Sequence, residues 1–425
     1  MENIRKYYNY LISLMDESEY QTRIRKVYDY YKSSFKNGYI LTEKQPASMF
    51  LAKTYEPDIP IYYIMQIELY LNQYVEYDAA FITRLYPKYN LIGSLLDQLK
   101  NTKNFDDKNR KMLKQNNKSV ENDLFEICTA CLYIKNGYKD VEFLIEKKDE
   151  KTPDLRADDL YIECKRKAKE CQYSIDERNH WYKQYLPISD FFQKNNLPLV
   201  FKVIFKNELN TYNDGFVLNI IKHMLFISKN DNYDDENISI NIYPVNFEKY
   251  NNEKKNRPFI IDKPDFNKTL FNYDSQQGGI TTNFELEFEN NYKVSPKIHY
   301  ASAGIWYSVS QEAKNKKVVS LQTNLIKAIN QIPFEKDGNI HICFESYESK
   351  EIEKMMIEHA LNDLNKINTE NKKIHNIFIH ILRFETNDNI DSIFEEQVIF
   401  FNTPMSKHEL KDMYIFSADN TIPYK

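Results

Sequence analysis

The segment that decides the fold runs from Pro153 to Lys165 and reads PDLRADDLYIECK. Side chains alternate between the two faces of a β-strand, so Glu163 and Lys165 share one face while Cys164 points to the other, toward a core. Asp154 starts a neighbouring strand across a tight turn. The spacing therefore predicts that two carboxylates and one ammonium group meet in one small volume.

The residues around this segment predict a helix followed by an antiparallel meander. Ser119 is a candidate N-cap for a helix that continues to Lys135 and stops before Asn136-Gly137. The expected strands are Val141 to Glu146, Asp154 to Ala157 and Leu160 to Lys165, with Asp158-Asp159 as the turn between the last two.

Two carboxylates and a lysine at this spacing suit the hydrolysis of phosphodiester bonds. That reaction needs a metal ion that neutralises charge on the phosphate and activates a water molecule. Mg²⁺ prefers oxygen ligands and keeps several waters, so one or two carboxylates are enough to bind it. A nearby ammonium group can orient the water or stabilise the developing negative charge.

The segment resembles the PD-(D/E)xK nuclease superfamily, whose members are restriction-endonuclease-like. The match consists of Pro153-Asp154 and Glu163-Cys164-Lys165, with Leu124-Phe125-Glu126 and Asn136-Gly137-Tyr138 upstream, as in the first core helix of that fold. The resemblance implies an α/β fold, in which a central mixed sheet is flanked by helices. An ordinary charged surface hairpin is the alternative, but it does not explain an acid at Glu126 in a mostly apolar helix.

The resemblance also implies roles for individual residues. Asp154 and Glu163 would be metal ligands, Lys165 the catalytic lysine, Glu126 an auxiliary acid, and the main-chain carbonyl of Cys164 a further metal contact. The implied cofactor is Mg²⁺, with Mn²⁺ as a substitute. The implied activity is that of a nuclease acting on DNA, in restriction or anti-phage defence. A ribonuclease, a repair nuclease, or an inactive nuclease-fold binding or assembly module are the alternatives.

A later helix, capped by Ser320 and running to Ile332, carries a further candidate catalytic residue. Lys327 and Gln331 lie one turn apart on its polar side, and nucleases of this type carry such residues on the helix after the ExK strand. In one arrangement this helix completes the core, and the residues at about 207–316 form an insertion within it. In the other, a helix from Asp176 to Gln193 completes the core, and the C-terminal part of the chain is separate. We favour the first arrangement.

The remaining segments alternate between strands and helices. We expect strands at 198–205, 339–344 and 377–384, β-like alternation at 281–310, helices at 216–226 and 350–364, and exposed loops at 229–237 and 248–257.

The first 118 residues are expected to be helical and carry no catalytic motif. We predict that this region binds a partner or the target or mediates self-association, so that a homo-oligomer is one expected outcome. The alternative is that these helices simply pack on the nuclease core and complete it. The polar, basic stretch from Leu99 to Lys118 is a linker or a solvated helix.

The composition of the chain limits which other classes of protein are possible. The net charge of -5 means that nucleic acid would have to bind through a local patch, and the basic run from Lys165 to Lys169 is the candidate. Five cysteines in a long chain argue against a disulfide scaffold. No apolar run approaches the roughly 20 residues of a membrane span. We expect a cytoplasmic protein that does not enter a membrane.

Overall fold

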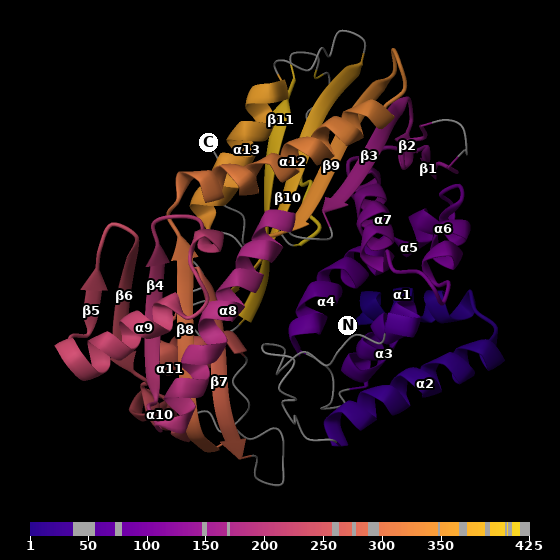
Figure 1. The fold of residues 1–425 in the computed structure, drawn as a ribbon. Coiled ribbons are helices and arrows are strands. Elements are labelled where there is room, and N and C mark those ends of the chain that lie inside the picture. The colour runs from indigo at the N-terminus through magenta and orange to yellow at the C-terminus, as the bar shows by residue number, and fades with distance from the viewer. Residues whose placement is uncertain are drawn as a thin grey trace.

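The Pro153–Lys165 segment folds into two antiparallel strands, β2 (Leu155–Ala157) and β3 (Leu160–Lys167). At the turn between them Asp158 has a φ of 50°, a left-handed conformation that a short polar side chain tolerates. Strand β2 also pairs with β1 (Val141–Phe143), and the three strands form the predicted meander. Figure 1 shows this meander at one edge of a larger sheet.

The computed structural model describes residues 1–36, 56–72, 79–146, 151–167, 171–256, 263–273, 278–287, 297–346, 349–364, 372–386, 392–403, 406 and 410–416. Across these ranges the fold is mixed α/β, with two mixed sheets that are flanked by helices. No helix within them is long and apolar enough to cross a membrane.

The first sheet has six strands in the order β1-β2-β3-β9-β10-β11. Strand β9 (Asp337–Glu345) runs parallel to β3 and to β10 (Lys373–Thr386), and β11 (Ser392–Asn402) returns antiparallel to β10. In the pairing of β3 with β9, Glu163 lies opposite Ile340. The chain therefore returns to the same sheet after a long excursion, which is the first of the two arrangements considered above.

Helices cover both faces of the first sheet (Figure 1). On one face Cys164 of β3 packs with residues of α7 (Val120–Lys135), the predicted first helix. On the other face α12 (Gln311–Gln331) and α13 (Lys350–Leu364) pack on Ile340 and Ile342 of β9. The alternation of β3 thus buries Cys164 toward α7 and turns Glu163 toward α12.

The second sheet lies in the insertion between β3 and α12, and its strand order is β5-β6-β4-β8-β7. Its strands are β4 (Leu199–Phe205), β5 (Asn232–Asp234), β6 (Ile238–Pro244), β7 (Gly279–Glu287) and β8 (Lys297–Ser308). Helices α8 (Gln172–Lys194) and α9 (Phe216–His223) cover one face, and α10 (Phe247–Asn256) and α11 (Lys263–Phe271) the other. Gly304 of β8 allows this packing, because a Cβ there would lie 2.8 Å from the ring of Trp181 on α8.

The described part of residues 1–118 is helical, as expected, and residues 37–55 and 73–78 lie outside the described residues. Its helices are α1 (Glu2–Ser13), α2 (Glu17–Lys36), α3 (Ile59–Leu71), α4 (Ala79–Ser94), α5 (Leu96–Lys100) and α6 (Phe105–Met112). Their buried side chains, among them Tyr7, Ile64 and Leu85, belong to the same hydrophobic cluster as α7 and the meander. A shared core favours the alternative in which these helices pack on the rest of the chain and complete its core, and an independent N-terminal module stays a prediction.

Several expected boundaries need correction. The helix expected to start at Ser320 is α12, which already begins at Gln311 because the hydroxyl of Ser310 caps it. The segment 248–257, expected as an exposed loop, is mostly helix α10. Its sequence is largely polar, although one side of the helix packs against the hydrophobic core. The insertion starts before residue 207, since α8 and β4 already belong to the second sheet unit.

Candidate active site

Strand β3 places the central pair of the site. Glu163 is fully buried, whereas the Lys165 side chain is 28% exposed, and its ammonium group pairs with the Glu163 carboxylate. The two residues share a face because they are two positions apart in a strand. A buried acid thus lies next to a lysine that reaches solvent, as the spacing predicts.

Asp154 joins this pair from the start of β2. The Cys164 main-chain N–H donates a hydrogen bond of 2.8 Å to Oδ2 of Asp154, which fixes the half-buried carboxylate beside β3. The antiparallel register, which sets Leu155 opposite Ile162, holds the two strand segments side by side. The hairpin therefore brings Asp154, Glu163 and Lys165 together.

Helix α7 contributes Glu126, whose side chain is only 16% exposed. Its carboxylate pairs with the ammonium group of Lys108, which also contacts Oδ1 of Asp123 at 2.7 Å. Lys108 lies on α6, within the stretch expected to be a linker or a solvated helix. Sequence reasoning missed it, because Lys108 meets residues from a different helix and belongs to no motif.

Three carboxyl groups at this site, those of Asp154, Glu163 and Glu126, have raised pKa values. Burial raises the pKa of Asp154, and the nearby charge of Glu163 raises it further. Burial also raises the pKa of Glu163 to about 7, with Lys165 opposing and Glu126 adding to the shift. The pKa of Glu126 is raised by burial and by Asp154, against the effect of Lys108. The two lysines do not fully offset the acids, so an added cation would be favoured here.

The donor set fits a hard divalent cation. Both carboxylate oxygens of Glu163 are buried, and neither accepts a hydrogen bond of good geometry from the part of the chain that the structure describes, Lys165 being the close partner. Among the described residues no three His, Cys, Asp or Glu side chains are already gathered as a metal site. Mg²⁺ needs only one or two carboxylates and completes its shell with waters, so Asp154 and Glu163 suffice.

Cys164 can take part only through its main chain. Its side chain is buried on the α7 face, and burial raises the pKa of the thiol well above its usual value. A protonated thiol is a poor metal ligand. This is compatible with the predicted contact through the carbonyl.

Two other predicted residues are placed differently. Gln331, at the end of α12, lies with Nε2 at 3.5 Å from the carbonyl oxygen of Thr152, beside the chain that leads to Asp154. The Gln331 side chain thus contacts the main chain near the site, at Thr152. Lys327 is exposed on the same helix.

The basic run after Glu163 is only partly available for phosphate. Lys165 and Lys167 alternate onto the face of Glu163. Arg166 points to the other face, where it pairs with Glu345 at 2.9 Å and with Glu121 at 3.8 Å, so its expected role at the substrate is corrected to a structural one. Lys169 lies outside the described residues.

Comparison of the chain with protein-family models, with curated proteins and with solved structures found no match. The function must therefore be inferred from the site itself.

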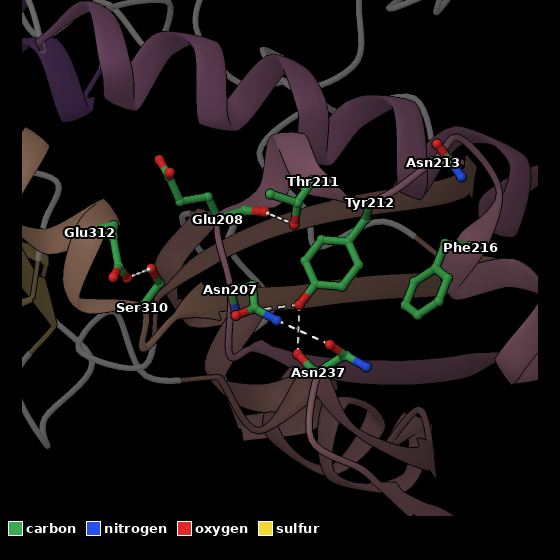
Figure 2. A pocket seen from close by; sticks show the side chains of 9 residues that line it. All are labelled: Asn207, Glu208, Thr211, Tyr212, Asn213, Phe216, Asn237, Ser310 and Glu312. Atoms are coloured by element: carbon green, nitrogen blue, oxygen red, sulfur yellow. Dashed lines mark hydrogen bonds between the residues drawn. The ribbon is translucent and has the colours of Figure 1, made fainter.

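A hollow of about 550 Å³ on the second sheet unit is a weaker candidate (Figure 2). Its polar groups satisfy one another: the Tyr212 hydroxyl donates to the carbonyl oxygen of Asn237 at 2.6 Å, and the Ser310 hydroxyl donates to Glu312 at 3.0 Å. It opens at the start of α12, while Gln331 lies at the other end of that helix, roughly 30 Å away at 1.5 Å per residue. The hollow therefore lies away from the acids.

Proposed function

We propose that this chain is a metal-dependent nuclease that hydrolyses phosphodiester bonds in DNA. The observation that carries the proposal is the meeting of Asp154, Glu163 and Lys165 on one hairpin, where burial raises the pKa values of both acids. A neighbouring carboxylate adds to each shift, Glu163 for Asp154 and Glu126 for Glu163. Buried carboxylates with raised pKa values in a polar cluster are typical of functional sites. Their chemistry suits an Mg²⁺ or Mn²⁺ ion.

In this proposal each residue has a separate task. Asp154 and Glu163 would hold the metal, with the Cys164 carbonyl as a further contact. The bound metal would neutralise charge on the scissile phosphate and lower the pKa of a water molecule. Glu126 would act as an auxiliary acid that adds negative charge near Asp154 and Glu163.

Lys165 has the position that a catalytic lysine needs. Its ammonium group pairs with Glu163, and its side chain is partly open to solvent. With Glu163 holding the cation, the ammonium group of Lys165 would be available to the substrate. It would then orient the attacking water or stabilise the negative charge that develops on the phosphate.

The order of elements also supports the proposal. Helix α7, the β1-β2-β3 meander, α12 and the parallel strand β9 follow one another as the resemblance to PD-(D/E)xK nucleases implies, with the second sheet inserted before α12. The choice of DNA over RNA, and a role in restriction or anti-phage defence, rest on that resemblance.

A cleavage assay tests the proposal. Purified protein is incubated with plasmid DNA, linear duplex, single-stranded DNA and RNA, each with Mg²⁺, Mn²⁺ or excess EDTA. We expect cleavage of DNA with either metal and none with EDTA. Cleavage that continues in EDTA would overturn the metal mechanism. No cleavage of any substrate would instead support the inactive binding module.

A further inference from the structure

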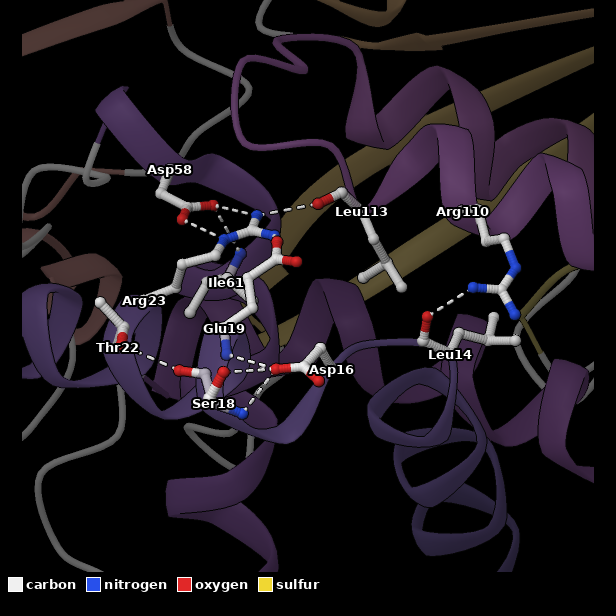
Figure 3. A network of polar contacts seen from close by, with 10 residues as sticks. All are labelled: Leu14, Asp16, Ser18, Glu19, Thr22, Arg23, Asp58, Ile61, Arg110 and Leu113. Atoms are coloured by element: carbon white, nitrogen blue, oxygen red, sulfur yellow. Dashed lines mark hydrogen bonds and ion pairs between the residues drawn. The ribbon is translucent and has the colours of Figure 1, made fainter.

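The C-terminal end of helix α6 is fixed to the N-terminal helices by polar contacts (Figure 3). Arg23 of α2 binds Asp58 through two hydrogen bonds of 2.8 Å and donates a third, also of 2.8 Å, to the carbonyl oxygen of Leu113 just after α6. Arg110 of α6 donates to the carbonyl oxygen of Leu14 at 2.8 Å. These bonds tie the position of α6 to helices α1 and α2.

Helix α1 adds two tyrosines to this attachment. The Tyr7 hydroxyl donates to Oδ1 of buried Asn109 at 2.8 Å, and the Tyr10 hydroxyl donates to Oδ1 of Asp106 at 2.6 Å. The ring of Tyr10 also stacks on Phe105, with centroids 5.3 Å apart. Because Phe105, Asp106 and Asn109 all belong to α6, that helix cannot shift relative to α1 without breaking several of these contacts.

From the same helix Lys108 reaches the acid cluster, which consists of Glu126, Asp154 and Glu163. Its side chain is 9% exposed, and its ammonium group bridges Asp123 and Glu126, which lie three residues apart on one side of α7. Asp123 is held in turn by Asn117, whose Nδ2 donates to its Oδ2 at 2.7 Å. Glu126 is therefore positioned by a residue of the N-terminal region.

A second path connects the segment before α6 with Asp154. The carbonyl oxygen of Lys103 accepts a hydrogen bond of 3.1 Å from the N–H of Phe143, and the Asn104 side chain donates to the carbonyl oxygen of Phe143 at 2.7 Å. The next residue, Leu144, donates its N–H to the carbonyl oxygen of Asp154 at 3.0 Å. The chain from 103 to 113 is thus connected to the site by two routes, one through Lys108 and one through Phe143 and Leu144.

We propose that Lys108 is a positioning residue for the acid cluster, through which the N-terminal helices set the geometry and the charge of the active site. This inference rests on the proposed nuclease function for the meaning of the site, but the contacts themselves do not. Lys108 supplies a fixed internal positive charge close to the metal-binding acids. It holds Glu126 in place and limits the negative field that a metal ion meets.

This role predicts opposite changes in metal binding and in turnover. Removing the charge in Lys108→Met leaves Asp123 and Glu126 without their cation, so the field on a divalent ion grows and Mn²⁺ should bind roughly fivefold more tightly. Glu126 loses its anchor, so kcat for DNA cleavage should fall at least about tenfold, while KM for DNA changes less than about twofold. A merely structural role would weaken metal binding and turnover together.

The test compares Lys108→Met with Lys108→Met/Glu126→Gln and with the control Lys111→Met, all in the full-length chain. Mn²⁺ binding is measured by calorimetry, and cleavage by steady-state kinetics. The double variant removes one positive and one negative charge, so its Mn²⁺ affinity should return to within about twofold of wild type. Lys111 lies on the same helix, is 57% exposed and pairs at 3.6 Å with an exposed Glu146, so its variant should behave as wild type.

The outcomes separate the two claims. If wild-type protein binds no Mn²⁺ and cleaves nothing, the nuclease proposal fails. If wild-type protein does both and Lys108→Met leaves Mn²⁺ affinity and kcat unchanged, or lowers both, the positioning role is overturned. Should Lys108→Met not fold, Lys108→Gln tests the charge alone, because its amide can still donate hydrogen bonds to Asp123 and Glu126. Its Mn²⁺ affinity should rise while kcat falls less than in Lys108→Met, and an unchanged or lowered affinity overturns the role.

Discussion

The variant Glu163→Gln should stabilise the metal-free protein at alkaline pH. Burial is the main reason that the pKa of Glu163 rises from 4.5 to about 7, with Lys165 acting in the opposite direction. The side chain is fully buried, so water does not screen this effect. At about 1.4 kcal/mol per pKa unit, the difference between the folded and unfolded states corresponds to about 3 kcal/mol.

The sign follows from proton binding. Because the pKa is raised in the folded state, the folded protein holds the proton more tightly than the unfolded chain does. The corresponding stability is fully present below pH 4.5 and is lost as the pH rises through about 7. Glutamine has a similar shape and no charge, so the variant escapes this loss. We expect Glu163→Gln to match wild type within about 1 kcal/mol near pH 4.5 and to exceed it by up to about 3 kcal/mol at pH 8.

Urea unfolding in excess EDTA, followed by circular dichroism at both pH values, measures the effect. Glu358→Gln is the matched control, since Glu358 is exposed on α13, and its variant should stay within about 0.5 kcal/mol of wild type. The reasoning is refuted if Glu163→Gln is less stable than wild type at pH 8, or if its difference from wild type is the same at both pH values.

Four further outcomes are expected. Asp154→Asn and Lys165→Ala should each lower plasmid cleavage more than about 100-fold with an unchanged circular dichroism spectrum, and Glu126→Gln about tenfold. Mn²⁺ should raise the melting temperature of wild type more at pH 8 than at pH 6, because the metal displaces protons from acids with raised pKa values. DNA binding, measured by fluorescence anisotropy, should weaken with salt, with a log-log slope of roughly -0.9 per phosphate contact. A fragment of residues 119–425 should be insoluble or unfolded on expression, because it loses half of a shared core and the partner of Glu126.

Local patterns in the sequence were enough to predict the hairpin. Period-two alternation placed Glu163 and Lys165 on one face and Cys164 in the core, and the structure confirms both placements. The helix from Val120 to Lys135 was predictable for a similar reason, since Ser119 precedes it and Gly137, which has a φ of 88°, follows it. Ser119 holds the predicted N-cap position, but its side chain makes no capping hydrogen bond. In such elements the signal lies within a few residues of the chain.

Features that depend on distant parts of the chain were not predictable. Parallel pairing of β3 with β9 joins residues separated by the whole second sheet, and no local pattern specifies it. Lys108 looked like one more lysine in a polar stretch, because its acidic partners lie on another helix. Helix α10 was hidden by its Asn, Glu and Lys content, although Tyr250 packs one side of it into the core.

If Asp154 serves metal-dependent cleavage at this hairpin, its replacement must stop cleavage while a neighbouring aspartate can be replaced without effect. Single-turnover cleavage of labelled DNA in Mg²⁺ is measured for wild type, for Asp154→Asn and for Asp159→Asn. Asp159 is an exposed aspartate in the turn of the same hairpin and makes a matched control. We predict wild-type rates for Asp159→Asn and a loss of more than about 100-fold for Asp154→Asn. Equal rates for Asp154→Asn and wild type would contradict the account.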